Sequence, residues 1–132
     1  MSEHLMEGLG QPDVLIIIDW RDGPVEGILR RRGEVTCWYF RLFAERPETA
    51  VLDDRIFALW VLPDADGAVL SGEFGDAGHG AHVWPVSGGL GSVEARRIVD
   101  GILSAGPGSP NLLVRTSDFI DIMGVWEVVA SG

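Results

Sequence analysis

The sequence predicts an α+β fold, in which a mostly antiparallel sheet of about six strands carries one or two helices on one face. Three observations favour it. Short runs of branched and aromatic residues recur along the chain, turn-forming residues separate them, and one later segment has clear helical periodicity. The 132 residues, 46% of them hydrophobic, are enough for one core. We therefore expect a single compact domain over residues 1–132, with residues 1–12 frayed.

Three strands are predicted at the start of the domain. Val14–Asp19 is a continuous apolar run of the kind found in strands buried on both faces. Asp22-Gly23-Pro24 breaks the chain. Val25–Arg31 and Glu34–Phe43 then read as two strands joined by a tight turn. The last of these is apolar on both alternating faces, so it is expected to be central in the sheet.

The middle of the chain is ambiguous between helix and strand over residues 47–62. Pro47 suits the first turn of a helix, whereas Ile56–Leu62 is rich in strand-forming residues and ends at a proline. We expect a loop followed by a strand. Asp64-Ala65-Asp66-Gly67 predicts a turn, which a short strand at Ala68–Ser71 could follow.

The clearest helix is predicted after a loose, glycine-rich stretch at Gly72–Gly91. Ser92 can cap its start and Gly106-Pro107 stops it. Its expected buried stripe consists of Ala95, Ile98, Val99, Ile102 and Leu103. Two closing strands are predicted at Leu112–Thr116 and Met123–Ala130.

Charge and composition exclude several function classes. The net charge is −10, and all ten basic residues are arginine. Such a surface repels phosphate backbones and anionic lipid, so neither nucleic acid nor a membrane is an expected partner. The absence of lysine excludes Schiff-base and P-loop chemistry. The segment Met1–Asp13 has no lysine or arginine, so we expect no secretory signal there. The only cysteine, Cys37, is expected to be buried. A cytoplasmic location fits best.

A histidine pair in the glycine-rich stretch has donor groups that could bind a metal. His79 and His82 are three residues apart and follow Asp76, which supplies the donor types that zinc prefers. However, the surrounding glycine-rich stretch has no helix to fix the ring directions, and no further histidine is near. We therefore predict a surface loop, with no metal and no cofactor.

The segment after the first predicted strand concentrates polar groups. Asp19, Trp20, Arg21 and Asp22 could provide acid–base groups or hold an anion, although an internal Arg–Asp pair that stabilises the turn is favoured. The stretch Asp19–Gly27 resembles the opening of small uncharacterised bacterial proteins, which carry Asp-aromatic-x-Asp-Gly-Pro-x-x-Gly after a strand. That resemblance implies no activity, because none is established for those proteins.

Two functions follow from these features. The favoured hypothesis is a small acidic, non-enzymatic protein-binding module, such as an immunity or antitoxin-like partner of a basic protein, with a loop tryptophan as anchor. The alternative is a small enzyme or ligand-binding domain whose site is built from the loop after the first strand and the glycine-rich loop. The candidate binding residues are Asp19, Trp20, Arg21, Asp22, His79, His82 and Trp84. No catalytic residue is assigned.

Overall fold

The computed structural model of the protein describes residues 12–20, 24–31, 35–44, 56–74, 82–83, 92–116 and 126–131. The strands in these ranges are β1 (Pro12–Trp20), β2 (Pro24–Arg31), β3 (Cys37–Ala44), β4 (Ile56–Val61), β5 (His82–Val83), β6 (Leu112–Thr116) and β7 (Trp126–Ser131). The helices are α2 (Asp64–Phe74) and α3 (Val93–Ala105). The predicted α+β class is confirmed.

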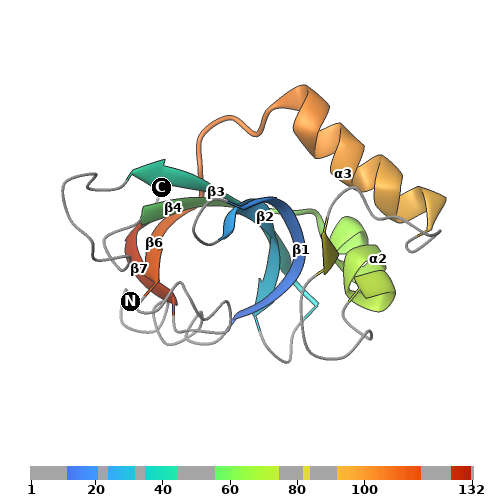
Figure 1. The fold of residues 1–132 in the computed structure, drawn as a ribbon, viewed down its shortest axis with the longest axis horizontal. Coiled ribbons are helices and arrows are strands. Elements are labelled where there is room, and N and C mark those ends of the chain that lie inside the picture. The colour runs from blue at the N-terminus through green and yellow to red at the C-terminus, as the bar shows by residue number, and fades with distance from the viewer. Residues whose placement is uncertain are drawn as a thin grey trace.

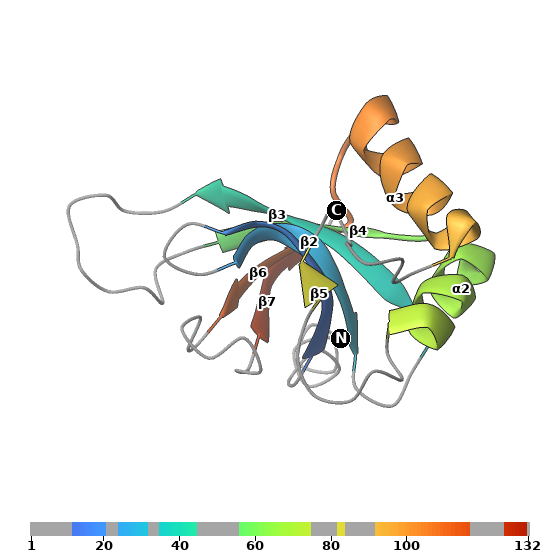
Figure 2. The same ribbon diagram turned by 45° about the vertical axis from the view of Figure 1, so that its right-hand side comes forward.

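All described strands belong to one sheet, in the order β5-β1-β2-β3-β4-β6-β7. Neighbours are antiparallel except β1 and β5, which are parallel. The sheet is strongly curved, and α2 and α3 lie on its outer side (Figure 1). The turned view in Figure 2 keeps both helices on that side. Strand β3 is the middle strand, as its two apolar faces predict.

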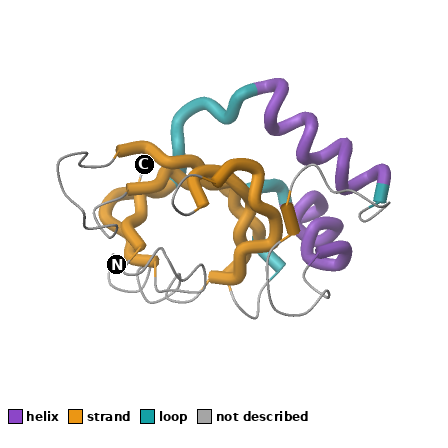
Figure 3. Tube along the Cα trace, in the orientation of Figure 1, coloured by secondary structure: helices purple, strands orange, loops and turns teal. Residues whose placement is uncertain are grey.

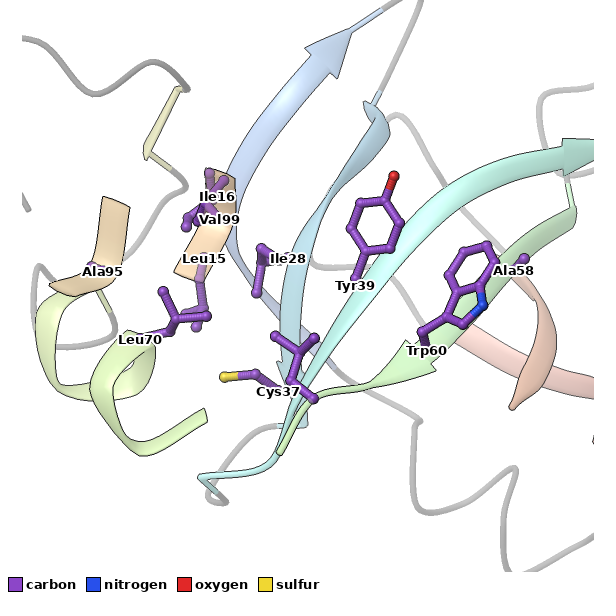
Figure 4. Close-up of a cluster of buried hydrophobic side chains, with 11 residues drawn as sticks. Leu15, Ile16, Ile28, Cys37, Tyr39, Ala58, Trp60, Leu70, Ala95 and Val99 are labelled. Atoms are coloured by element: carbon purple, nitrogen blue, oxygen red, sulfur yellow. The ribbon is translucent and has the colours of Figure 1, made fainter. Parts of the chain in front are cut away.

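Each central strand contributes to two cores, one on each face of the sheet. Alternation places Tyr39 of β3 in the outer core, beneath the helices, and its neighbour Phe40 in the inner core. Ile28 and Leu29 of β2 are divided in the same way. Figure 4 shows the outer core, where Val99 of α3 meets strand side chains. The continuous apolar runs in the sequence are therefore explained by burial on both faces.

The turn predicted at Asp64–Gly67 is wrong, because these residues form the first turn of α2. The carbonyl oxygen of Pro63 accepts the first helical hydrogen bond, from the Gly67 N–H at 2.9 Å. Asp64 and Asp66 lie near the positive end of the helix dipole, which favours carboxylates. The short strand suggested at Ala68–Ser71 is likewise replaced by α2.

Helix α3 agrees with prediction at both ends. The Ser92 hydroxyl accepts a hydrogen bond from the Ala95 N–H at 3.1 Å, and Gly106 ends the helix with a φ of 75°. The buried stripe is narrower than expected. Ala95 and Val99 are fully buried, whereas Leu103 is 42% exposed and its predicted burial is wrong.

The remaining predictions have mixed outcomes. The predicted strand over Ile56–Leu62 is confirmed as β4, while residues 47–55 lie outside the described residues. Strand β6 matches its prediction, and β7 overlaps the predicted strand Met123–Ala130. Residues 1–11 and most of the glycine-rich stretch also lie outside the description. Neither described helix has the length and apolar character needed to cross a bilayer.

Candidate functional site

A hollow of about 470 Å³ lies between α3 and the outer face of β3 and β4. We name it the Trp60 hollow. Residues that line it include Tyr39, Trp60, Asp66, Arg97, Ile102 and Asn111. Its volume falls within the range of about 300–1,000 Å³ that is typical of small-molecule sites. The hollow is therefore large enough for a small ligand.

The sheet side of the hollow is an aromatic pair. Tyr39 and Trp60 are cross-strand partners on β3 and β4, and their ring centroids are 5.3 Å apart with an interplanar angle of 36°. Figure 4 shows both side chains on the outer core face. The indole N–H of Trp60 donates a hydrogen bond to the Gly108 carbonyl oxygen at 3.0 Å. Strand pairing and this hydrogen bond together fix the wall before any ligand arrives.

A polar row continues this wall along the sheet. The Tyr39 hydroxyl donates a hydrogen bond to the carboxylate of Glu26 on β2. The guanidinium of Arg41, the cross-strand partner of Glu26, lies 5.5 Å from the Trp60 ring centroid. Burial, and then the Glu26 carboxylate, raise the pKa of the Tyr39 phenol well above its ordinary value. Tyr39 is thus a proton donor at neutral pH rather than a base.

The opposite wall comes from α3 and the loop that follows it. Figure 3 shows this loop leading from α3 back to the sheet. Gly101 of α3 lines the hollow, and a Cβ at this position would meet no atom within 4 Å. The Asn111 N–H donates to the Leu59 carbonyl oxygen at 2.8 Å, and its side-chain Oδ1 accepts from the Val61 N–H at 2.9 Å. Glycine leaves the space open, and Asn111 anchors the loop at its margin.

Two charges of opposite sign line the hollow. Asp66 comes from α2 and Arg97 from α3, and both residues line the hollow. A smaller hollow of about 280 Å³ lies beside it and shares Trp60, with Arg41 and Phe43 among its other lining residues. The site therefore combines apolar, aromatic, cationic and anionic groups.

Cys37 lies in the outer core and is fully buried, as predicted. Its Sγ atom is 3.5 Å from the Gly67 carbonyl oxygen and 3.5 Å from the Ser71 hydroxyl. Burial raises the pKa of the thiol. A protonated thiol without access to solvent is a structural group rather than a nucleophile.

Little of the site predicted from the sequence falls within the described residues. Asp19 is exposed near the end of β1 and is the cross-strand partner of Glu26. Trp20 ends β1, and His82 begins β5, where its backbone pairs with that of Ile16. The sheet therefore brings part of the glycine-rich stretch alongside β1. Arg21, Asp22, His79 and Trp84 lie outside the described residues.

Sequence reasoning missed the Trp60 hollow because Ile56–Leu62 was interpreted only as a strand, in which an apolar side chain such as Trp60 is expected to pack in the core. Trp60 is indeed 8% exposed, yet it also forms the wall of the hollow. One signal was available. Gly101 lies in the interior of the predicted helix, where glycine is less favourable than alanine, and the structure places it in the lining of the hollow.

Comparison with known proteins gives no relative for this chain: no family model matches it, and no curated protein or solved structure does so significantly. The function is therefore argued from the site.

Proposed function

We propose that the protein is a non-enzymatic binding module that holds a small amphipathic ligand in the Trp60 hollow. The observation that carries this proposal is the lining itself. A fixed aromatic pair, Tyr39 and Trp60, faces the aliphatic side chains Ile98 and Ile102, and two opposite charges join them. Apolar and polar groups contribute to this lining in similar measure, and polar groups that converge beside an apolar wall can fix the orientation of a small ligand.

Two protonation states argue against a phenolate base at Tyr39 and a thiolate nucleophile at Cys37. A general base works best with a pKa near the operating pH, and a cysteine nucleophile must be a thiolate. Tyr39 beside the hollow and Cys37 in the core both have a raised pKa. Both groups therefore keep their protons at neutral pH, which suits a structural role and hydrogen-bond donation.

A ligand screen on matched variants tests the proposal. Gly101→Leu places a side chain in the open space of the hollow, and Gly72→Leu places the same side chain on α2, where a Cβ also meets no atom within 4 Å. Both replace an exposed helical glycine, so both should fold. Ligand-observed NMR with a library of small amphipathic molecules is then recorded on the wild type and both variants.

We expect molecules that bind the wild type to bind Gly72→Leu equally and to lose binding to Gly101→Leu. If all hits bind Gly101→Leu as they bind the wild type, the ligands occupy another surface and the proposal fails. A wild type that binds no library member would also contradict it.

A basic protein partner is the second candidate, and the charge of −10 favours it. In addition, α2 carries Asp64, Asp66 and Glu73 and no basic residue, with Asp64 and Glu73 exposed. This helix offers a cationic surface a complementary docking face. Once a partner is purified, its association rate with this protein should fall as salt is raised and should fall again in an Asp64→Asn, Glu73→Gln variant. An association rate independent of both would remove this candidate.

A further inference from the structure

We infer that the ligand of the Trp60 hollow is a small zwitterion with an apolar side chain, such as a free amino acid or dipeptide with an aromatic or branched side chain. The inference rests on the proposed ligand-binding function and names the chemical class of the ligand. It follows from the placement of three kinds of group around one hollow, on three different elements.

The apolar part of the ligand is specified by the facing walls. Trp60 on β4 is held by its hydrogen bond to Gly108, and Ile98 and Ile102 of α3 face the hollow as partly buried side chains. A flat or branched hydrocarbon group between these walls would be shielded from water on both of its faces. Aromatic rings in particular gain from offset or tilted contact with an indole.

The charged part of the ligand is specified by Arg97 and Asp66. A guanidinium binds a carboxylate in a two-point geometry, and a carboxylate binds an ammonium group. Because both signs line one hollow, a simple anion would meet repulsion from Asp66, and a simple cation would meet repulsion from Arg97. A molecule that carries both charges satisfies both side chains.

The size of the hollow and the polar residues at its margin are consistent with an amino acid or dipeptide ligand. A volume of about 470 Å³ lies in the lower half of the range for small-molecule sites, of about 300–1,000 Å³, which suits an amino acid or dipeptide. Ser109 and Asn111 line the same hollow and bring a hydroxyl and a carboxamide. These groups can exchange hydrogen bonds with a peptide unit or an α-amino acid head group.

Isothermal titration with three related probes tests the inference. The probes are L-phenylalanine, 3-phenylpropanoate, which lacks the ammonium group, and 2-phenylethylamine, which lacks the carboxylate. We expect L-phenylalanine to bind about tenfold or more tightly than either analogue, since each analogue loses one charge-assisted contact and leaves the repulsion of its remaining charge unbalanced.

Two charge variants assign the contacts. Arg97→Gln should weaken L-phenylalanine and 3-phenylpropanoate but not 2-phenylethylamine, and Asp66→Asn should show the opposite selectivity. Asp100→Asn is the control, because Asp100 is exposed on α3 and does not line the hollow. It should leave all three affinities unchanged.

The failures are distinguishable. If 3-phenylpropanoate binds as tightly as L-phenylalanine, with Gly101→Leu still abolishing both, the zwitterion inference is overturned while the binding function stands. If the probes bind Gly101→Leu unchanged, the proposed function itself is contradicted. If none of the three probes binds the wild type, the inference is overturned, and hits from the ligand screen then decide the function.

Discussion

Trp60 and Gly108 are joined by a hydrogen bond from the indole N–H to the backbone carbonyl oxygen, at 3.0 Å, across 48 positions of sequence. The bond ties β4 to the loop between α3 and β6. Since this loop closes one side of the Trp60 hollow, the same contact that stabilises the fold also shapes the proposed site.

Trp60→Phe should weaken both the fold and the site. It removes the N–H donor and part of the ring, which should lower the free energy of unfolding by about 1–2 kcal/mol. Trp60→Ala should cost about 3–5 kcal/mol, because it leaves a cavity against the outer core. Urea unfolding measures both. A Trp60→Phe protein with wild-type stability and wild-type ligand affinity would show that the hydrogen bond to Gly108 has no role.

The Tyr39 phenol should ionise only at strongly alkaline pH. Tyr39 is the only tyrosine, so ultraviolet absorbance of phenolate reports this side chain alone. Burial and the Glu26 carboxylate raise its pKa above the ordinary value of 10.0. Glu26→Gln should lower the pKa of Tyr39, because it removes the carboxylate charge. A wild-type protein that forms phenolate at the ordinary pKa while still folded would refute this environment.

The same shift makes stability depend on pH in a defined direction. The folded-state pKa is raised, so the folded state retains the phenol proton after the unfolded chain has lost it. The stabilising contribution is therefore complete below pH 10.0 and is lost as pH rises from there through the folded pKa. Tyr39→Phe should show a smaller loss of stability over that window.

Two glycines of α2 should respond to alanine with opposite signs. A Cβ at Gly67 would lie 2.8 Å from the Val35 carbonyl oxygen, whereas one at Gly72 would meet nothing within 4 Å. Gly67→Ala should therefore destabilise the protein by about 1–3 kcal/mol, and Gly72→Ala should stabilise it by about 0.5–1 kcal/mol. Thermal unfolding of the two variants provides the comparison. A stabilising Gly67→Ala would mean that α2 does not pack closely on the chain before β3.

Cys37 should react with thiol reagents only when the structure opens. It is fully buried, and burial raises its pKa, so both access and thiolate content are low. We expect labelling of the native protein to be about a thousandfold or more slower than in denaturant. Rapid native labelling, followed by mass spectrometry, would place Cys37 at the surface instead.

The sequence predicted correctly those elements that are determined by residues close together in the chain. The alternation that divides Tyr39 from Phe40 predicted a central strand, and Ser92 and Gly106 predicted the ends of α3. Asp64–Gly67 misled because aspartate and glycine favour both turns and helix starts. In this protein these residues begin a helix, and Gly67 of that helix packs closely against Val35, which is distant in the sequence.

Apart from the isolated Gly101, no feature of the sequence indicated the Trp60 hollow, for a related reason. Trp60, Arg97 and Asn111 come from a strand, a helix and a loop, and none carries a local sign of the others. Only the pairing of β3 with β4 and the packing of α3 on the sheet bring them together. Sequence patterns instead drew attention to Asp19 and His82, where polar residues are adjacent in the chain.

A two-dimensional amide and indole NMR spectrum, recorded as a bound ligand is titrated, tests the central claim most directly. If the Trp60 hollow is the binding site, the largest shifts will be those of the Trp60 indole and of the Gly101 and Asn111 amides, with Gly72 unchanged. Largest shifts instead at Asp19 and His82 would contradict this account and support the site first predicted from the sequence.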